Sequence, residues 1–139
     1  MIRSLGHAEA MAAIAAVREE LERRRDAAVV AVGDAHGETV ALLRMDGAPV
    51  FATAVAINKA WTAARLRRSS RTVGEAIRDR SRGVDASSYG DPRIVGWAGG
   101  VPVTLDGEVV GAVGVSGMSQ ALDEELAEIG IAGILRALG

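Results

Sequence analysis

The spacing of apolar residues predicts long helices at both ends of the chain and in its middle. Between residues 8 and 24, apolar side chains recur every three or four positions, which is the spacing of one helical face. These side chains are Met11, Ile14, Val17 and Leu21. Residues 51–66 and 119–138 also predict helices, and a shorter helix is expected to begin at Thr72, where Glu75 completes a capping box.

Five short segments have the pattern of strands. Residues 27–32 and 39–45 flank a turn and predict a hairpin, and residues 94–97 predict a third strand. A second hairpin is expected around Asp106-Gly107, because both central residues of such a turn need positive φ. The element order is therefore α-β-β-α-α-β-β-β-α. It predicts an α+β fold in which helices cover a five-stranded antiparallel sheet.

The last predicted strand, residues 109–115, contains no polar side chain, which is typical of a strand buried on both faces. Gly111 and Gly114 lack a Cβ, so a helix backbone could approach the strand closely there. Gly117 ends the strand, and Ser119 is expected to be the N-cap of the final helix. This stretch therefore predicts a tight joint between a buried strand and a helix.

Composition narrows the classes of function. A chain of 139 residues fits one domain, residues 1–139, and its net charge of −2 gives no general attraction to nucleic acid. Without cysteine there is no disulfide or thiolate chemistry, and two distant histidines give no metal-ligand spacing. No apolar run is long enough to cross a membrane. Glu9 interrupts the apolar N-terminal stretch, so we interpret that stretch as an amphipathic helix and expect a cytoplasmic protein.

Three segments resemble the GlcG/HbpS family, which includes the C-terminal domain of PduO proteins. They are RMDGAP at residues 44–49, INKAWTA at 57–63, and the run from WAGGVP to AEIG at 97–130. The resemblance implies a profilin- or PAS-like fold, with a five-stranded antiparallel sheet and helices packed on it. It also implies homo-oligomers. The functions it implies are mixed: heme binding, corrinoid-associated domains and members of unknown role.

Lys59, the only lysine in the chain, lies inside the second of these segments. In a cleft it could anchor a carboxylate, or act as a base if desolvation lowers its pKa. The alternative is a structural ion pair, for example with Asp46 or Asp123. Arg44 has two interpretations as well: a clamp on the turn at Asp46, or a bidentate grip on a ligand carboxylate.

The predicted ligand site lies where Lys59, residues 99–102 and the joint at 116–119 converge. Backbone N–H groups at that joint could hold an anionic group at the helix N-terminus. The candidate ligand-binding residues are Arg44, Lys59, Trp61, Gly100, Pro102, Ser116 and Ser119.

The leading hypothesis is a small-molecule-binding domain whose ligand is heme or another tetrapyrrole. Heme would be held without a covalent bond, because no Cys-x-x-Cys-His segment is present, and His7 or His36 would be its axial ligand. The alternative is a cofactor-independent isomerase, cyclase or hydratase that acts on a carboxylate-bearing metabolite, with Lys59 or Asp123 as acid or base. A regulatory or assembly module is the third interpretation. We expect neither nucleic acid nor membrane as a partner.

Overall fold

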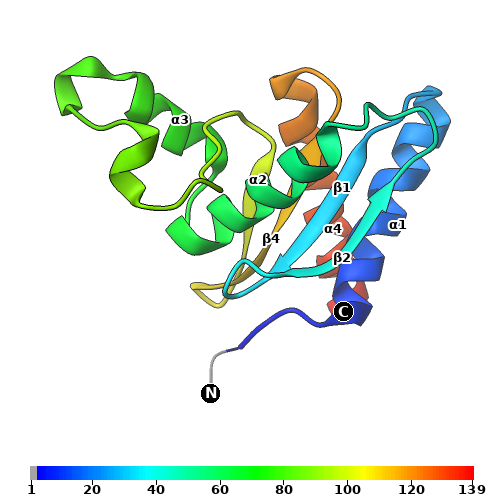
Figure 1. The fold of residues 1–139 in the computed structure, drawn as a ribbon. Coiled ribbons are helices and arrows are strands. Elements are labelled where there is room, and N and C mark those ends of the chain that lie inside the picture. The colour runs from blue at the N-terminus through cyan, green and yellow to red at the C-terminus, as the bar shows by residue number, and fades with distance from the viewer. Residues whose placement is uncertain (1–2) are drawn as a thin grey trace.

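A computed structural model of the chain describes residues 3–139, which form an antiparallel sheet with helices on both faces (Figure 1). In chain order the elements are α1 (His7–Arg24), β1 (Val29–Asp34), β2 (Thr39–Arg44), α2 (Ala52–Leu66), α3 (Ser70–Arg78), two short 3₁₀ helices (Arg80–Arg82 and Ala86–Tyr89), β3 (Gly100–Leu105), β4 (Glu108–Ser116) and α4 (Gln120–Leu138). The strands lie in the order β2-β1-β4-β3, and every neighbouring pair is antiparallel. The α+β class and the antiparallel sheet are therefore confirmed.

The predicted third strand is wrong, so the sheet within residues 3–139 has four strands and the element order lacks one β. Residues 94–97 are irregular because side chains of two helices form hydrogen bonds with backbone groups that would pair with a neighbouring strand in a sheet. Thr62 of α2 accepts a hydrogen bond from the N–H of Val95, and Arg78 of α3 donates to the carbonyl oxygen of Gly96. The segment is thus fastened to two helices instead of to a neighbouring strand.

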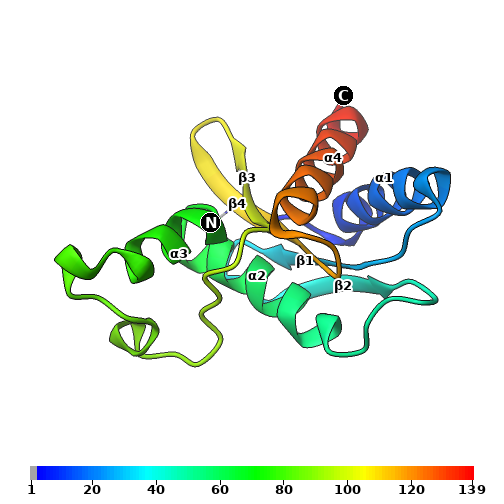
Figure 2. The ribbon, with the colours of Figure 1, turned by 90° about the horizontal axis from the view of Figure 1, so that it is seen from above.

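The helices form a layer on each face of the sheet. Figure 2 shows α1 and α4 on one face and α2 on the other. Side chains of a strand alternate between faces, and in β1 Val30 and Val32 pack toward α1 and α4, while Val29 and Ala31 pack toward α2. The whole of β4 from Val110 onward is buried, as its apolar sequence predicts.

Small residues bring α2 very close to the sheet. A Cβ on Gly114 would overlap the carbonyl oxygen of Ala56, and it would lie 2.7 Å from the backbone nitrogen of Ala60. The predicted close approach of a helix at Gly114 is therefore confirmed. At Gly111, by contrast, the neighbours are Leu5 and the adjacent strand.

Most of the predicted turn and cap chemistry is present, with two corrections. Asp106 and Gly107 have φ of 51° and 80°, as the predicted hairpin requires, and Ser119 caps α4 by accepting the N–H of Leu122. The N-cap of α3 is Ser69 and not Thr72, because its hydroxyl accepts the N–H of Thr72. In α1, Met11 is 55% exposed, so it does not belong to the buried face. No helix of residues 3–139 is both long and apolar enough to cross a membrane.

Candidate functional site

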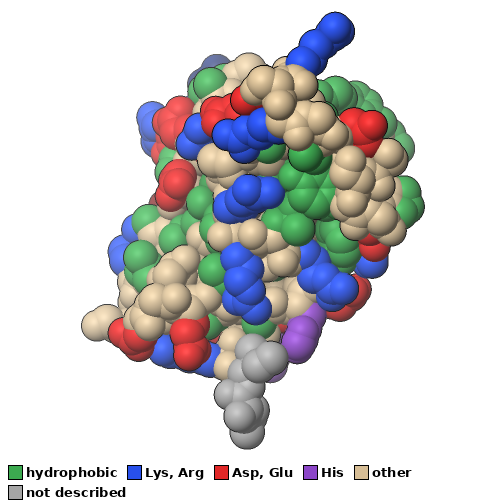
Figure 3. All heavy atoms as spheres, turned by 90° about the vertical axis from the view of Figure 1, so that its left-hand side faces the viewer, with side chains coloured by type: hydrophobic (Ala, Val, Ile, Leu, Met, Phe, Trp, Pro, Cys, Tyr) green, Lys and Arg blue, Asp and Glu red, His purple; other side chains and the backbone are tan. Residues whose placement is uncertain are grey.

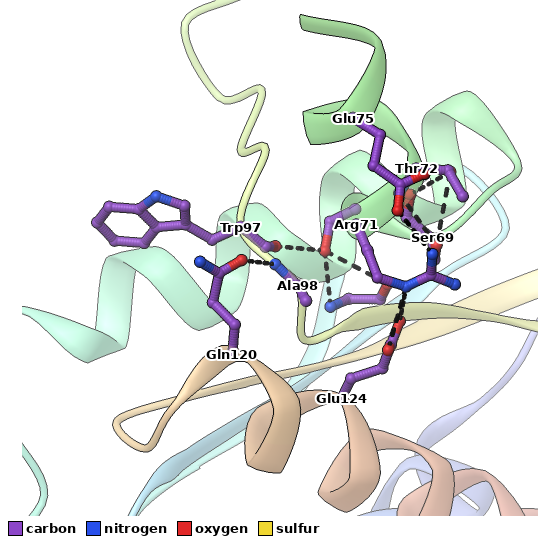
Figure 4. Close-up of polar contacts among 10 residues, drawn as sticks. Ser69, Arg71, Thr72, Glu75, Trp97, Ala98, Gln120 and Glu124 are labelled. Atoms are coloured by element: carbon purple, nitrogen blue, oxygen red, sulfur yellow. Dashed lines mark hydrogen bonds and ion pairs between the residues drawn. The ribbon is translucent and has the colours of Figure 1, made fainter. Parts of the chain in front are cut away.

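The segment that leads into β3 is held by side chains from α3 and α4. The hydroxyl of Ser70 donates to the carbonyl oxygen of Trp97 at 2.7 Å and accepts the N–H of Gly100 at 2.9 Å. The side chain of Gln120 accepts the N–H of Ala98 at 2.9 Å. The indole of Trp97 points away from these contacts (Figure 4). Its backbone is therefore fixed from within, while its ring lies on the outside.

Beneath this segment lies a buried ion pair between α2 and α4. The amine of Lys59 is 3.0 Å from a carboxylate oxygen of Asp123, and the two residues are only 1% and 2% exposed. The amine also donates to the carbonyl oxygen of Val115 at 2.9 Å, and the second carboxylate oxygen accepts the N–H of Met118 at 3.0 Å. Because α2 and α4 cover opposite faces, the pair connects the two helical layers around the end of β4.

Burial works against the charge on both partners. It lowers the pKa of Lys59 and raises the pKa of Asp123, and the attraction between the two groups opposes each shift. In a pair with so little contact with water, the mutual attraction offsets the lost hydration only where the geometry is good and the remaining polar atoms are hydrogen-bonded. Losing either partner would therefore leave a costly charge behind.

Two glycines allow the segment to close over the pair. Gly99 has φ of 128°, and a Cβ there would lie 2.6 Å from the carbonyl oxygen of Val115 and 2.8 Å from the amine of Lys59. A Cβ on Gly100 would overlap the carbonyl group of Lys59. The predicted convergence of Lys59 with residues 99–102 is thus observed, but the amine contacts Asp123 inside the protein. This is the arrangement of the structural ion pair.

A shallow hollow lies on the outer side of the same segment. It has a volume of about 250 Å³ and is lined by Val55 of α2 and by residues 94–97. Trp97 is 52% exposed, and Phe51, one helical turn before Val55, is 67% exposed. We call Phe51, Val55 and residues 94–97 the Trp97 surface. Phe51 and Trp97 are exposed and the residues between them are partly buried, and apolar surface of this kind commonly marks a binding site.

Three other predicted ligand residues lie at this end of the sheet or along β3. Ser116 is buried at the end of β4, and the hydroxyl of Ser119 is used to cap α4. Pro102 is partly buried in β3, opposite Ala112. None of these side chains lines the hollow under Trp97.

Arg44 is separated from the end of β4, where Lys59 lies, by the width of two strands. It pairs with Val29, which in turn pairs with Ser116, so two strand spacings, about 10 Å, lie between Arg44 and the joint after β4. Arg44 is exposed and borders a different cavity of about 380 Å³, next to Arg18 of α1. Arg44 forms no ion pair with Asp46 among residues 3–139, so the predicted clamp on that turn is absent, and its grip on a ligand carboxylate stays a prediction.

The two histidines lie at the opposite end of the sheet. His36 follows β1, whose first residue pairs with Ser116 and whose last pairs with Gly111, a run of about 17 Å. His7 begins α1, close to Leu5, whose N–H donates to Val110. Both histidines therefore lie about the length of β1 away from the joint after β4.

Trp61 is also at the histidine end, and it is 4% exposed. The guanidinium of Arg93 lies 4.2 Å from the centre of its ring, and Arg65 donates to the carbonyl oxygen of His36. Figure 3 views the molecule from the left-hand side of Figure 1 and shows basic side chains gathered in a column, with a histidine near its lower end. The predicted site residues are thus divided between two ends of the molecule.

Comparison with known proteins relates nearly the whole chain to one family. The family model described as "Haem degrading protein HbpS-like" matches residues 5–132. Protein GlcG of Escherichia coli strain K12 is 39% identical over 108 residues, which cover 77% of each chain. An uncharacterised 15.0 kDa protein from the dhaT-dhaS intergenic region of Citrobacter freundii is 41% identical over 105 residues, or 72% of this chain and 70% of that one.

Solved structures share the same arrangement of helices and strands. The Klebsiella pneumoniae protein ORFY aligns with a TM-score of 0.89 and 29% identity, covering 97% of this chain and 93% of that one. A complex of PduOC with heme aligns with a TM-score of 0.86 and 25% identity, covering 95% of both chains.

Proposed function

The chain belongs to the family described as haem degrading protein HbpS-like, and we propose that it binds heme or a related tetrapyrrole without a covalent bond. The observation that carries the proposal is the Trp97 surface, an exposed aromatic shelf on a fold whose solved neighbour PduOC is a heme complex. Aromatic side chains prefer offset stacking against other planar rings. We place one face of the macrocycle on Trp97.

The Trp97 surface offers apolar contacts for the macrocycle of a tetrapyrrole but no histidine as an axial ligand for its iron. A hollow of about 250 Å³ lies just below the usual range of ligand pockets, roughly 300–1,000 Å³, so it would take one edge of the macrocycle while the rest covers Trp97 and Phe51. Heme iron takes His, Met, Tyr or Cys as an axial ligand. His7 and His36 lie at the other end of the sheet, so in this proposal they would serve from a second copy of the chain, in keeping with the expected homo-oligomer.

In this proposal the chain's own residues bind and orient the ligand. Trp97 and Phe51 cover one face of the ring and exclude water from it, and the buried Lys59–Asp123 pair keeps the segment that carries Trp97 in place. The bound group itself would supply the redox chemistry of its iron.

Replacing Trp97 by alanine tests the location. Covering the exposed half of an indole buries roughly 100 Å² of apolar surface, worth about 2.5 kcal/mol, so the dissociation constant of hemin should rise roughly 50-fold. Hemin titration followed by the Soret band measures this. Trp61→Phe is the control, because Trp61 is buried, lies outside the lining of the hollow and should leave the affinity unchanged.

Two results of this titration would count against different statements. An unaltered affinity in Trp97→Ala, with a loss in His36→Ala, would move the ligand to the histidine end and contradict the proposed location. A wild-type protein without any Soret shift at stoichiometric hemin would contradict tetrapyrrole binding itself.

The enzymatic alternative gains no support from the geometry. Lys59 and Asp123, its predicted acid and base, are bonded to each other under the segment 97–100. A substrate could touch them only if that segment moved away.

A further inference from the structure

Arg78, the last residue of α3, borders the Trp97 surface. Its guanidinium donates to the carbonyl oxygen of Gly96 at 3.1 Å, and Gly96 lines the hollow beside Trp97. One turn earlier on α3, Gly74 is in direct backbone contact with Gly96, so closely that a Cβ on Gly74 would overlap its carbonyl. Helix α3 therefore packs directly against residues 94–97. This contact sets the position of the Arg78 backbone relative to Trp97.

Three arginines near Arg78 have carboxylate partners, whereas Arg78, like exposed Arg80, has none within 4 Å among residues 3–139. Arg71 pairs with Glu75 and Glu124, Arg82 with Asp79, and Arg93 with Asp91. A guanidinium offers five N–H donors, and a single hydrogen bond from Arg78 is present. Most of its donors therefore remain free for an anion, and its exposed position leaves them accessible.

An aromatic surface with one uncompensated cation at its border suits a particular class of ligand. A ligand that covers Trp97 needs a planar apolar ring system, and a ligand that binds Arg78 needs an acidic group at the edge of that ring system. We infer that Arg78 binds the carboxylate of a planar ligand that stacks on Trp97. The inference rests on the proposed function, and for a tetrapyrrole the carboxylates are its propionates.

The test compares hemin with hemin dimethyl ester, which keeps the macrocycle and lacks both negative charges. Arg78→Gln should weaken hemin about 10-fold, the typical effect of losing a charge-assisted hydrogen bond, and leave the diester unchanged. The effect on hemin should shrink as salt is raised. Arg82→Gln is the matched control, because Arg82 is already paired with Asp79 and should change neither ligand.

An equal loss for both ligands, or no loss for hemin, would overturn the role of Arg78. If Trp97→Ala still weakens hemin in that case, the proposed function stands without this inference. Should the wild-type protein not bind hemin, anilinonaphthalene sulfonate and neutral N-phenylnaphthylamine provide the same comparison by fluorescence. If Arg78→Gln then weakens binding of the sulfonate alone, the inference is supported. If the variant and the wild-type protein bind the sulfonate with equal affinity, the inference is overturned.

Discussion

Replacing Lys59 by methionine is expected to lower the free energy of unfolding by about 3–5 kcal/mol, the cost of removing one partner of a buried ion pair. Methionine fills much of the same space, so the loss comes from the carboxylate of Asp123, which stays 2% exposed without its partner. Urea unfolding of the variant measures the change.

Asp123→Asn and the double variant isolate the pair from its surroundings. Asparagine keeps an oxygen for the N–H of Met118 and removes the charge. The double variant should therefore lose much less than the sum of the two single changes. Additive losses would contradict a coupled ion pair.

The loss in Lys59→Met should also depend on pH. Burial raises the pKa of Asp123 above its ordinary value of 3.8, and without Lys59 only the hydrogen bond from the N–H of Met118 still opposes that shift. The folded variant then keeps a proton that the unfolded chain releases, so the contribution of Asp123 to stability is greatest below pH 3.8 and falls as pH rises through the folded pKa. The difference from wild type should be smaller at pH 4 than at pH 7. An equal loss of stability at pH 4 and at pH 7 would mean that the charge on Asp123 is not the cause of the loss.

Replacing Gly99 by alanine should cost about 3 kcal/mol or more, because two effects combine. The backbone φ of 128° is one that alanine rarely adopts, and its Cβ would lie within 2.9 Å of atoms from Val115, Lys59 and Asp123. Gly90→Ala is the matched control, since its φ is 73° and nothing lies within 4 Å of the added Cβ. It should show the backbone cost alone, about 1–2 kcal/mol.

The same variant links stability to ligand binding. The segment that carries Trp97 must shift to admit a Cβ at Gly99, so hemin affinity should fall in Gly99→Ala and stay unchanged in Gly90→Ala. Equal stability of the two variants would contradict the close packing at Gly99.

Local chemistry was predictable from the sequence wherever a residue type suits few conformations. The Asp106-Gly107 turn, the cap at Ser119 and the helix contact at Gly114 all follow from side chains or from their absence. Residues 94–97 were not predictable in this way. A short apolar run has the pattern of a strand, and only the tertiary contacts of Thr62 and Arg78 explain why it is irregular.

The candidate site depended on non-local information. The family resemblance brought Lys59 and residues 99–102 together, but the strand order β2-β1-β4-β3 decides that His36 and Arg44 lie elsewhere. Hydrophobic periodicity assigns apolar residues to the core, so it could not reveal that Trp97 and Phe51 are exposed. The sequence signal that could have indicated this surface is the spacing of Phe51 and Val55, four residues apart at the start of α2, directly after Val50, which is also exposed.

The location of the ligand is tested most directly with the two tryptophans of the chain, Trp97 and Trp61, which lie beside different parts of α2. Trp97 lies beside Val55, and Trp61 is six residues, about 9 Å, further along the helix. In an NMR titration with paramagnetic hemin, the indole N–H signal of Trp97 should broaden more strongly than that of Trp61, because the iron lies nearer to Trp97. Stronger broadening of the Trp61 signal would contradict the proposed location.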